Sequence, residues 1–471
     1  MSVERLLIFN GVRVAGEATH PVVSPWSGAT VATVHQASAA QAELALKAAW
    51  AARARLAKKS SGERRAVLHK VIEGLKKHSE AFAKVICEEA GKPIAAARVE
   101  VARAIESFTI AAAEVTTFSQ AAPVVDVMPA AAGTEALVHR VPAGVIVGIV
   151  PFNFPLNLGV HKVAPALAVG APMIVKPPPQ APSAMVMLGE LVLEAGADPA
   201  ALQVLPCDNT VAEQLATDSR VAVMSFTGSA AVGWRLKPKV ARKAVLELGG
   251  NAAAIVCADA NLEVAVPRLV NGAFAYAGQV CIKVQRIIVL AQVWDAFVTQ
   301  FVAAARQVVT GDPANEKTLC GPVIDAKSAQ RIDFWVREAV AQGAQVLLGG
   351  TFEKQLWQPT VLTNVPRECR AYSEEIFGPV VVLEKVNSFA EAISAVNSSE
   401  YGLQAAVFTD SLAQVRQAFT ELEVGGVIVN DAPGFRSDAM PYGGVKNSGL
   451  GREGIRNAML DYTEERVLIL R

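Results

Sequence analysis

The sequence predicts an α/β protein with two lobes, each built on a doubly wound parallel sheet, and a separate protruding β segment. From residue 142 onward, short apolar runs alternate with helical stretches, as is typical of buried parallel strands covered by helices. The 471 residues exceed the size at which one hydrophobic core stops growing, about 250–300 residues. The segments 121–142 and 456–471 fit neither series of strands and indicate the protruding part.

Residues 1–35 are predicted to form short strands with turns, and long helices are expected after them. Leu6–Phe9 has the composition of a strand, and the segment after it is alanine-rich with periodic apolar positions. Ser38 can cap a helix over Ala39–Ala57, and residues 60–63 can open a second helix. A third helix is expected near Ile94–Glu114, so that amphipathic helices pack on a sheet.

Two series of apolar runs predict the two sheets. The first lobe, expected over 1–120 and 143–246, has runs at Gly144–Val150, Pro172–Val175 and Val221–Phe226. Helices are expected between these runs, at 159–168 and 183–195. The second lobe, expected over 247–455, has runs at Ala252–Cys257, Ile287–Leu290, Val346–Leu348 and Val380–Leu383. Strands that alternate with helices in this way favour parallel sheets.

The protruding part is predicted to consist of strands at Ala136–Arg140 and Arg466–Leu470. Both are apolar, and neither belongs to the alternating pattern of the lobes. Exposed apolar strands of this kind are usually covered by a partner subunit. We therefore expect the protein to assemble with copies of itself.

Composition excludes several classes of partner. Lys+Arg and Asp+Glu both number 44, so no positive field attracts nucleic acid or an anionic membrane surface. We see neither a secretory signal nor an apolar run of the roughly 20 residues that a membrane helix needs. Six scattered cysteines without a Cys-x-x-Cys pattern indicate a reduced, cytoplasmic protein. No His/Cys cluster has zinc-binding spacing, so no metal is expected.

Cys281 and Glu247 are the two candidate reactive side chains. Cys281 follows Gly278, whose backbone freedom allows a tight turn that can present a sulfur to a cleft. The alternative is that Cys281 is a small buried hydrophobe, which we accept for the other five cysteines. Glu247 ends an apolar strand beside two glycines and could act as a general base, or it could be a solvated acid at a turn.

Several residues that follow strands are candidates for ligand contacts. The Asn153 amide could stabilise an oxyanion, although an asparagine also suits an ordinary turn. Phe226–Ser229 leads into a helix whose N-terminus suits a pyrophosphate, but the usual Gly-x-Gly-x-x-Gly fingerprint is absent. Lys176 ends a strand where ligands bind open sheets, or it is a surface lysine.

Glu375 and Phe377 place a carboxylate and an aromatic ring on one predicted turn. The glutamate could accept hydrogen bonds from a ribose, and the ring could press on a flat ligand. Considered separately, Glu375 could instead be a surface glutamate and Phe377 a core phenylalanine.

The ordered set of motifs is more specific than any one of them. It comprises PFNFPLN, K-P, FTGS, LELGGN, GQVC, EEIFGP and PYGGVKNSGLGREG. This set resembles the aldehyde dehydrogenase superfamily along essentially the whole chain. The resemblance implies an enzyme that oxidises an aldehyde with NAD or NADP, and a homodimer or homotetramer held together by 121–142 and 456–471.

The resemblance implies a role for each catalytic candidate. Cys281 is the nucleophile, and Asn153 with the Cys281 N–H holds the oxyanion. Hydride transfer leaves a thioester, which a water activated by Glu247 hydrolyses. An oxyanion expels hydride more readily than a neutral thiohemiacetal does, so the cleft must supply donors beside the nicotinamide.

The resemblance also implies a cofactor-binding set in the first lobe and at its border with the catalytic second lobe. These residues are Pro151, Phe152, Lys176, Gly228, Ser229, Glu375 and Phe377. Phe152 replaces a commoner tryptophan. Pro179 stands where many NAD-preferring relatives carry a glutamate that repels a 2′-phosphate, so both cofactors remain open.

The substrate is expected to be a small aldehyde, with or without an α-hydroxyl group. PFNFPLN with His161 looks most like the branch with lactaldehyde, phosphonoacetaldehyde and non-phosphorylating glyceraldehyde-3-phosphate dehydrogenases. The candidates for the pocket wall are Phe154, His161, Phe435 and Arg436. His161 could equally be a structural histidine. Val280 is apolar where relatives acting on phosphorylated aldehydes often carry arginine, which argues against a strongly anionic substrate.

Two other functions stay open at this stage. In a CoA-acylating dehydrogenase, CoA replaces water, but such relatives usually lack a glutamate like Glu247. The second alternative is a structural or binding protein of the same fold that has lost catalytic activity. The presence of Cys281, Glu247 and Asn153 together argues against that second alternative.

Overall fold

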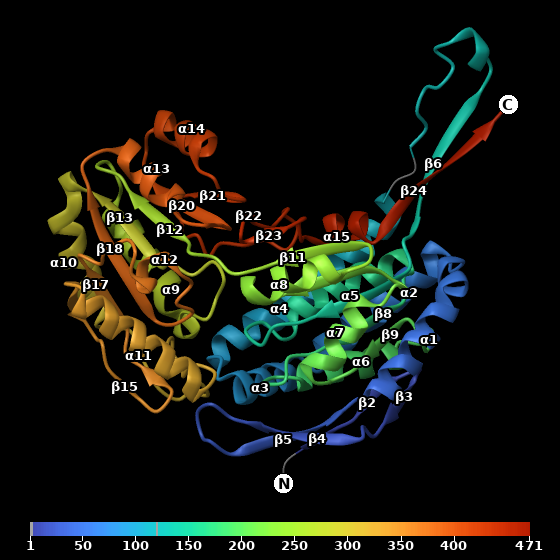
Figure 1. Cartoon of the computed structure of the whole chain (residues 1–471), viewed down its shortest axis with the longest axis horizontal. Coiled ribbons are helices and arrows are strands. Elements are labelled where there is room, and N and C mark those ends of the chain that lie inside the picture. The colour runs from blue at the N-terminus through green and yellow to red at the C-terminus, as the bar shows by residue number, and fades with distance from the viewer. Residues whose placement is uncertain (1–2, 119–120) are drawn as a thin grey trace.

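The computed structural model describes residues 3–118 and 121–471 and shows two lobes with an arm projecting from one of them (Figure 1). The ends of the predicted segment 1–120, residues 1–2 and 119–120, lie outside the described residues. A mixed α/β fold with a largely parallel sheet in each lobe is present, as the alternating pattern predicted.

The first lobe is organised around a sheet with strand order β23-β11-β10-β7-β8-β9-β2-β3. Its strands are β2 (Leu7–Phe9), β3 (Val12–Val14), β7 (Val145–Ile149), β8 (Met173–Lys176), β9 (Leu202–Val204), β10 (Val221–Thr227), β11 (Lys243–Glu247) and β23 (Gly449–Leu450). The pairs from β11 to β9 are parallel, whereas β23 and β2 join antiparallel at opposite ends. Parallel strands bring their carboxyl ends to one edge, and ligands bind at such edges.

Helices cover both faces of this sheet. They are α1 (Ala39–Ala57), α2 (Ser61–Lys77), α3 (Ser79–Ala90), α4 (Ile94–Thr117), α5 (Asn157–Val169), α6 (Ser183–Glu194), α7 (Asn209–Thr217), α8 (Ala230–Leu236) and α15 (Ile455–Asp461). Ile146 packs into the core with α2–α6, and the next residue, Val147, faces α1 and α7. Ser38 caps α1 and Ser60 caps α2, both as predicted.

The second lobe repeats the plan with strand order β14-β17-β18-β13-β12-β20-β21. Its strands are β12 (Ala253–Val256), β13 (Arg286–Leu290), β14 (Gln345–Leu348), β17 (Thr360–Thr363), β18 (Val380–Val386), β20 (Gln404–Phe408) and β21 (Gly426–Val429). The helices are α9 (Leu262–Phe274), α10 (Trp294–Ala305), α11 (Ala326–Ala341), α12 (Arg370–Ser373), α13 (Phe389–Asn397) and α14 (Leu412–Glu421). Only β14, at the edge, runs antiparallel among the described strands of this sheet.

The arm consists of β6 (Glu135–Pro142) and β24 (Thr463–Leu470), paired antiparallel along their whole length (Figure 1). Both strands were predicted. Val467, Leu468, Ile469 and Leu470 are between 46% and 56% exposed, so the arm presents apolar side chains to solvent.

Sequence reasoning missed several elements. Helix α3 follows α2 after the single residue His78, and the two therefore merged into one alanine-rich pattern. Short strands were expected over residues 1–35, but the pairing of β1 (Val3–Arg5), β5 (Thr30–Gln36) and β4 (Ala18–Val23) into a small separate sheet was not predicted. The short pairs β15 (Phe352–Glu353) with β16 (Leu356–Trp357), and β19 (Tyr401–Gly402) with β22 (Val445–Lys446), carry little pattern of their own.

The predicted lobe boundaries stay predictions, with one structural qualification. Strand β23 lies in the sequence range assigned to the second lobe but pairs with β11 of the first. The chain therefore returns to the first sheet near residue 449, and it does so beside the end of β11, at Glu247.

Candidate active site

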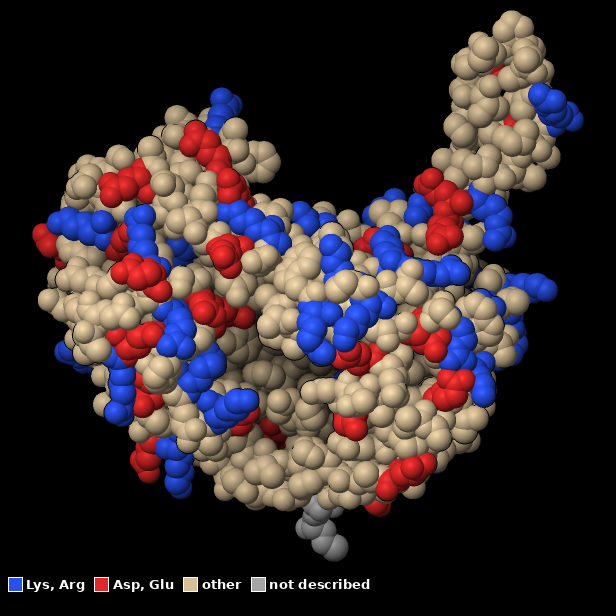
Figure 2. All heavy atoms as spheres, in the orientation of Figure 1, with Lys and Arg blue, Asp and Glu red and all other residues tan. Residues whose placement is uncertain are grey.

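A cavity of about 520 Å³ lies where the ends of β7, β10 and β11 meet the loop of Cys281. Figure 2 shows the face of the molecule hollowed between the two lobes. The predicted residues that line the cavity are Pro151, Phe152, Asn153, Gly228, Ser229, Glu247, Cys281, Glu375 and Phe377. The fold thus brings together motifs that are spread over more than two hundred positions.

Cys281 is carried by a strained turn that follows α9. Tyr276 and Ala277 both have φ 53°, a conformation rare for residues with side chains, and Gly278 has φ 65°. A Cβ at Gly278 would collide with the carbonyl of Gly378, so only glycine allows this close approach. The turn is therefore pressed against the motif that carries Glu375, and the half-buried thiol is presented to the cavity.

The surroundings of Cys281 act on the pKa of its thiol in opposite directions. Burial, followed by the nearby Glu247, raises the pKa of Cys281 well above its usual value. The Tyr442 hydroxyl, with its oxygen 3.1 Å from Sγ, acts in the opposite direction through a hydrogen bond. Because the thiolate is the nucleophilic form of cysteine, attack on a substrate requires that the sulfur lose its proton.

Glu247 is a buried carboxyl group that lines the same cavity as Cys281. It ends β11, is 3% exposed, and its Oε1 has no hydrogen-bond partner within the described residues. Burial and the neighbouring carboxylate of Glu453 raise the pKa of Glu247, while Arg436 and Lys162 oppose that rise. An acid with a pKa raised in this way can exchange protons near neutral pH.

A buried ionic network behind Glu247 was not predicted. Glu453 accepts hydrogen bonds from Lys162 Nζ at 3.0 Å, from Thr227 Oγ1 at 3.1 Å and from an Arg436 nitrogen at 3.1 Å. The Arg436 guanidinium carbon lies 3.7 Å from the ring centroid of Tyr442. Tyr442 and Glu453 both belong to the motif PYGGVKNSGLGREG, so that motif was the available signal. For Lys162, the sequence held no signal other than its position next to His161.

Asn153 is held against the nucleophile's turn. The residue is 4% exposed, and its Nδ2 donates a hydrogen bond to the backbone carbonyl of Gln279 at 3.0 Å. Because Nδ2 carries two hydrogens, one N–H remains for a ligand at the cavity.

The cofactor-side residues present aromatic and acidic groups to the cavity. The rings of Phe152 and Phe377 have their centroids 5.9 Å apart with an interplanar angle of 81°. Glu375 accepts the Gly250 N–H at 3.1 Å, and burial raises the pKa of Glu375 to about 7. Lys176 is buried rather than on the surface, and it does not line the cavity, although Pro179 does. An edge-on aromatic pair and a carboxylate beside a glycine turn suit a flat ring and a sugar diol.

The four predicted substrate residues are not part of the lining of this cavity. They are Phe154, His161, Phe435 and Arg436. His161 is fully buried and its Nε2 lies 2.6 Å from Asp438, as in a structural histidine. Phe435 is 51% exposed, and the Phe154 ring covers Lys92.

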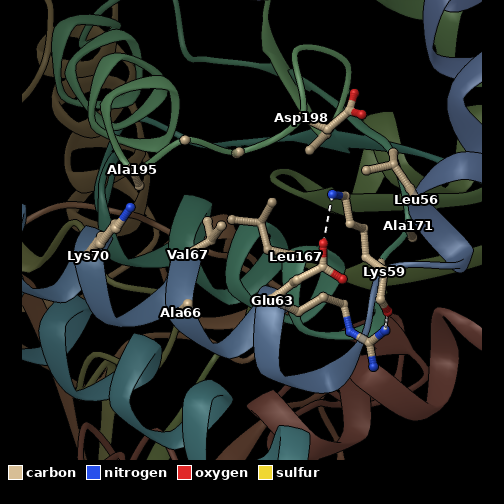
Figure 3. A pocket seen from close by; sticks show the side chains of 15 residues that line it. Leu56, Lys59, Glu63, Ala66, Val67, Lys70, Leu167, Ala171, Ala195 and Asp198 are labelled. Atoms are coloured by element: carbon tan, nitrogen blue, oxygen red, sulfur yellow. Dashed lines mark hydrogen bonds and ion pairs between the residues drawn. The ribbon is translucent and has the colours of Figure 1, made fainter.

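A second cavity, of about 260 Å³, opens between α2, the end of α5 and the loop after α6 (Figure 3). Its apolar floor includes Val67 and Leu167, and Lys59 pairs with Glu63 at its rim. None of the predicted site residues lines it.

Residues 3–118 and 121–471 bring together no group of three or more side chains able to hold a metal ion. Among the same residues, no helix has both the length and the apolar character needed to cross a membrane.

Comparison with known proteins decides the family. The sequence profile of the Aldehyde dehydrogenase family matches residues 13–468. The chain belongs to this family. It is accordingly an NAD(P)-dependent aldehyde oxidoreductase, as the motifs predicted.

Three relatives show the branch. The chain is 42% identical to 3-sulfolactaldehyde dehydrogenase of Priestia aryabhattai, with 86% of this chain and 85% of that protein covered. It is 39% identical to aldehyde dehydrogenase 21 of Physcomitrella patens, solved with the reaction product succinate, with TM-score 0.98 and coverage of 100% and 99%. It is 35% identical to a glyceraldehyde-3-phosphate dehydrogenase of Methanocaldococcus jannaschii, solved with NADP, with TM-score 0.93 and coverage of 96% and 99%.

Proposed function

We propose that this dehydrogenase oxidises a small aldehyde to its carboxylate through a thioester on Cys281, which water then hydrolyses. The observation that supports this most is the convergence of Cys281, Glu247 and Asn153 on one cavity. The aromatic and acidic groups opposite them suit a dinucleotide, which when bound supplies the hydride acceptor.

In the first half of the reaction, Cys281 Sγ forms a bond to the aldehyde carbon and its proton is released to solvent. The carbonyl oxygen becomes an oxyanion, held by the free Asn153 N–H and the Cys281 N–H. Fixed donors of this kind contribute roughly 3 kcal/mol each in other enzymes. Loss of hydride from that carbon then leaves a thioester on Cys281.

In the second half, Glu247 takes a proton from water, whose oxygen attacks the thioester carbon. The C–S bond breaks, the carboxylic acid departs, and the Cys281 sulfur regains a proton. The Glu453 network keeps cations close to Glu247, so that its negative form is tolerated in a buried place.

Direct detection of the thioester tests this mechanism. Glu247→Gln, mixed with aldehyde and cofactor, should gain the mass of the acyl group on the peptide that contains Cys281. The unmodified enzyme should release carboxylate and reduced cofactor in equal amounts. An adduct that forms on another residue, or none while turnover proceeds, would sink the proposal.

We also propose that the aldehyde is small and carries a hydroxyl or anionic group near the carbonyl. Two of the relatives are named for hydroxylated aldehydes that carry a sulfonate or a phosphate, and the third was solved with a dicarboxylate product. Arg436 supports such a group through its charge, because it lies over the ring of Tyr442, whose hydroxyl contacts Cys281 Sγ. The apolar Val280 argues against a strongly anionic substrate, whereas the ligands of the relatives argue for one, so the proposal includes hydroxylated as well as anionic aldehydes. Phe154, His161 and Phe435 stay predictions as pocket-wall residues.

A CoA-acylating reaction is the second candidate, because only the acceptor of the acyl group differs. The buried general base at Glu247 favours water. Product analysis in the presence of CoA separates the two: acyl-CoA formed faster than carboxylate would replace the hydrolytic proposal.

We propose that the arm joins copies of this chain into a dimer or a tetramer. Figure 2 shows that the arm is largely free of charge, and its strand β24 ends in exposed apolar residues. Such an edge stays soluble when another subunit covers it. Leu468→Asp should lower the mass measured by light scattering, whereas Leu412→Asp, on the exposed face of α14, should not.

A further inference from the structure

A buried ion pair lies behind the proposed oxyanion site. Lys92, in the link between α3 and α4, pairs with Glu100 on α4, and their side chains are 2% and 0% exposed. Two charges removed from water to this degree are costly unless they are satisfied by further hydrogen bonds. The remaining contacts of the pair therefore show what it stabilises.

Glu100 holds the end of the Asn153 loop. Its Oε1 accepts the backbone N–H of Leu156 at 2.9 Å and that of Asn157 at 3.1 Å. These are the first N–H groups of α5, where a carboxylate is favoured by both hydrogen bonding and the helix dipole.

Lys92 holds the start of the same loop. Its Nζ donates to the backbone carbonyl of Asn153 at 2.8 Å. The ammonium also lies 3.4 Å from the ring centroid of Phe154 and 4.8 Å from that of Tyr276, in the strained turn before Cys281. The pair therefore touches both the loop of the proposed oxyanion donor and the turn of the nucleophile.

We propose that Lys92 and Glu100 are positioning residues that set the Asn153 amide at the distance an oxyanion requires. The inference rests on the proposed role of Asn153. Donors act at 2.7–3.1 Å from the oxyanion, and a displacement of about 1 Å can cost on the order of a hundredfold in rate. A neutral Glu100 would weaken the link to Lys92 and to the two N–H groups that fix the loop.

A double-mutant cycle tests the proposal on the full-length enzyme with a good aldehyde substrate. Glu100→Gln should lower kcat by about 10- to 100-fold, with KM changed by less than about 3-fold. In an Asn153→Ala background the same substitution should cost less than about 2-fold, because the group it positions is gone. Glu106→Gln, on the exposed side of α4, is the matched control and should leave kcat unchanged.

Each other outcome overturns something definite. Equal losses from Glu100→Gln in both backgrounds, or no loss in either, would refute the positioning role alone. An unchanged kcat in Asn153→Ala would refute the oxyanion role of Asn153, and this inference with it. If Glu100→Gln does not fold, Lys92→Met carries the same cycle with Lys84→Met as control, and Lys92→Arg should restore part of kcat because it keeps the charge.

Discussion

The two sides of Cys281 are built differently. On the cofactor side, Phe152, Phe377 and Glu375 line the cavity, and the two rings meet edge to face. On the other side, Arg436 and His161 are buried in ion pairs and hydrogen bonds with Glu453 and Asp438. The open side can accept a large ligand by contact, whereas the closed side controls charge around the reacting atoms.

This difference shows why the role of some site residues can be predicted from a sequence motif and the role of others cannot. A residue that lines an open cleft can be recognised from its motif, because the motif itself shapes the cleft. A residue in a closed network takes its role from partners far away in the sequence, such as Lys162 and Glu453. Variants on each side should therefore differ in what they disturb.

The largest effect is expected for the residue between the two sides. Cys281→Ala should abolish formation of reduced cofactor, with a fall of roughly 10⁴-fold or more, because no other group can form the thioester. Initial rates with a panel of short aldehydes check this. Cys257→Ala, which changes a cysteine at the end of an apolar strand, should retain turnover.

Glu247→Gln should stall the enzyme after one burst of reduced cofactor. An amide cannot take the proton from water, so steady-state turnover should drop by about 10²- to 10⁴-fold while the first turnover survives. Rapid-mixing absorbance at the wavelength of the reduced nicotinamide measures the burst. Loss of the burst as well would show that Glu247 is also essential for the first proton transfer.

The charged groups on the closed side should affect how the rate of thioester hydrolysis depends on pH. Because burial and Glu453 raise the pKa of Glu247, thioester hydrolysis should increase with pH well above the range of an ordinary carboxyl group. The raised pKa also means that the folded state binds a proton that the unfolded state releases. Stability from this group is therefore present at acid pH and is lost as pH rises through the folded pKa. Glu247→Gln should accordingly raise Tm at neutral to alkaline pH, as calorimetry can measure, and a lowered Tm would contradict this.

Arg436→Met should change selectivity more than the rate with neutral aldehydes. We expect kcat/KM for a four-carbon aldehyde with a terminal carboxylate to fall by about 10- to 100-fold relative to the same chain with a terminal hydroxyl. Arg416→Met, on the exposed face of α14, controls for a change in net charge. Equal losses for both aldehydes would place Arg436 in the charge network only.

The smallest effect is expected on the open side. Glu375→Gln keeps the shape of the side chain and weakens only the acceptor for a ribose hydroxyl, so KM for the cofactor should rise by about 3- to 10-fold. Titration of cofactor in initial-rate assays checks this. A fall in kcat with an unchanged KM would instead connect Glu375 to hydride transfer.

Much of the fold could be predicted from the sequence. Ser38 and Ser60 marked helix starts because capping is a local interaction between neighbouring residues. The apolar runs marked most strands of both sheets because strands buried on two faces must be apolar throughout. The boundary between α2 and α3 was missed because a single residue separates two helices of similar composition.

The sequence by itself determined the family, the reacting residues Cys281 and Glu247 as candidates, and the expectation of a projecting arm. Each of these depends on short motifs or local patterns. Only the tertiary structure decided that Lys176 is buried, that Tyr442 lies on the nucleophile, and that Lys92 with Glu100 supports the Asn153 loop. Those contacts join residues far apart in the chain, and their energetics depend on burial, which no local pattern of residues encodes.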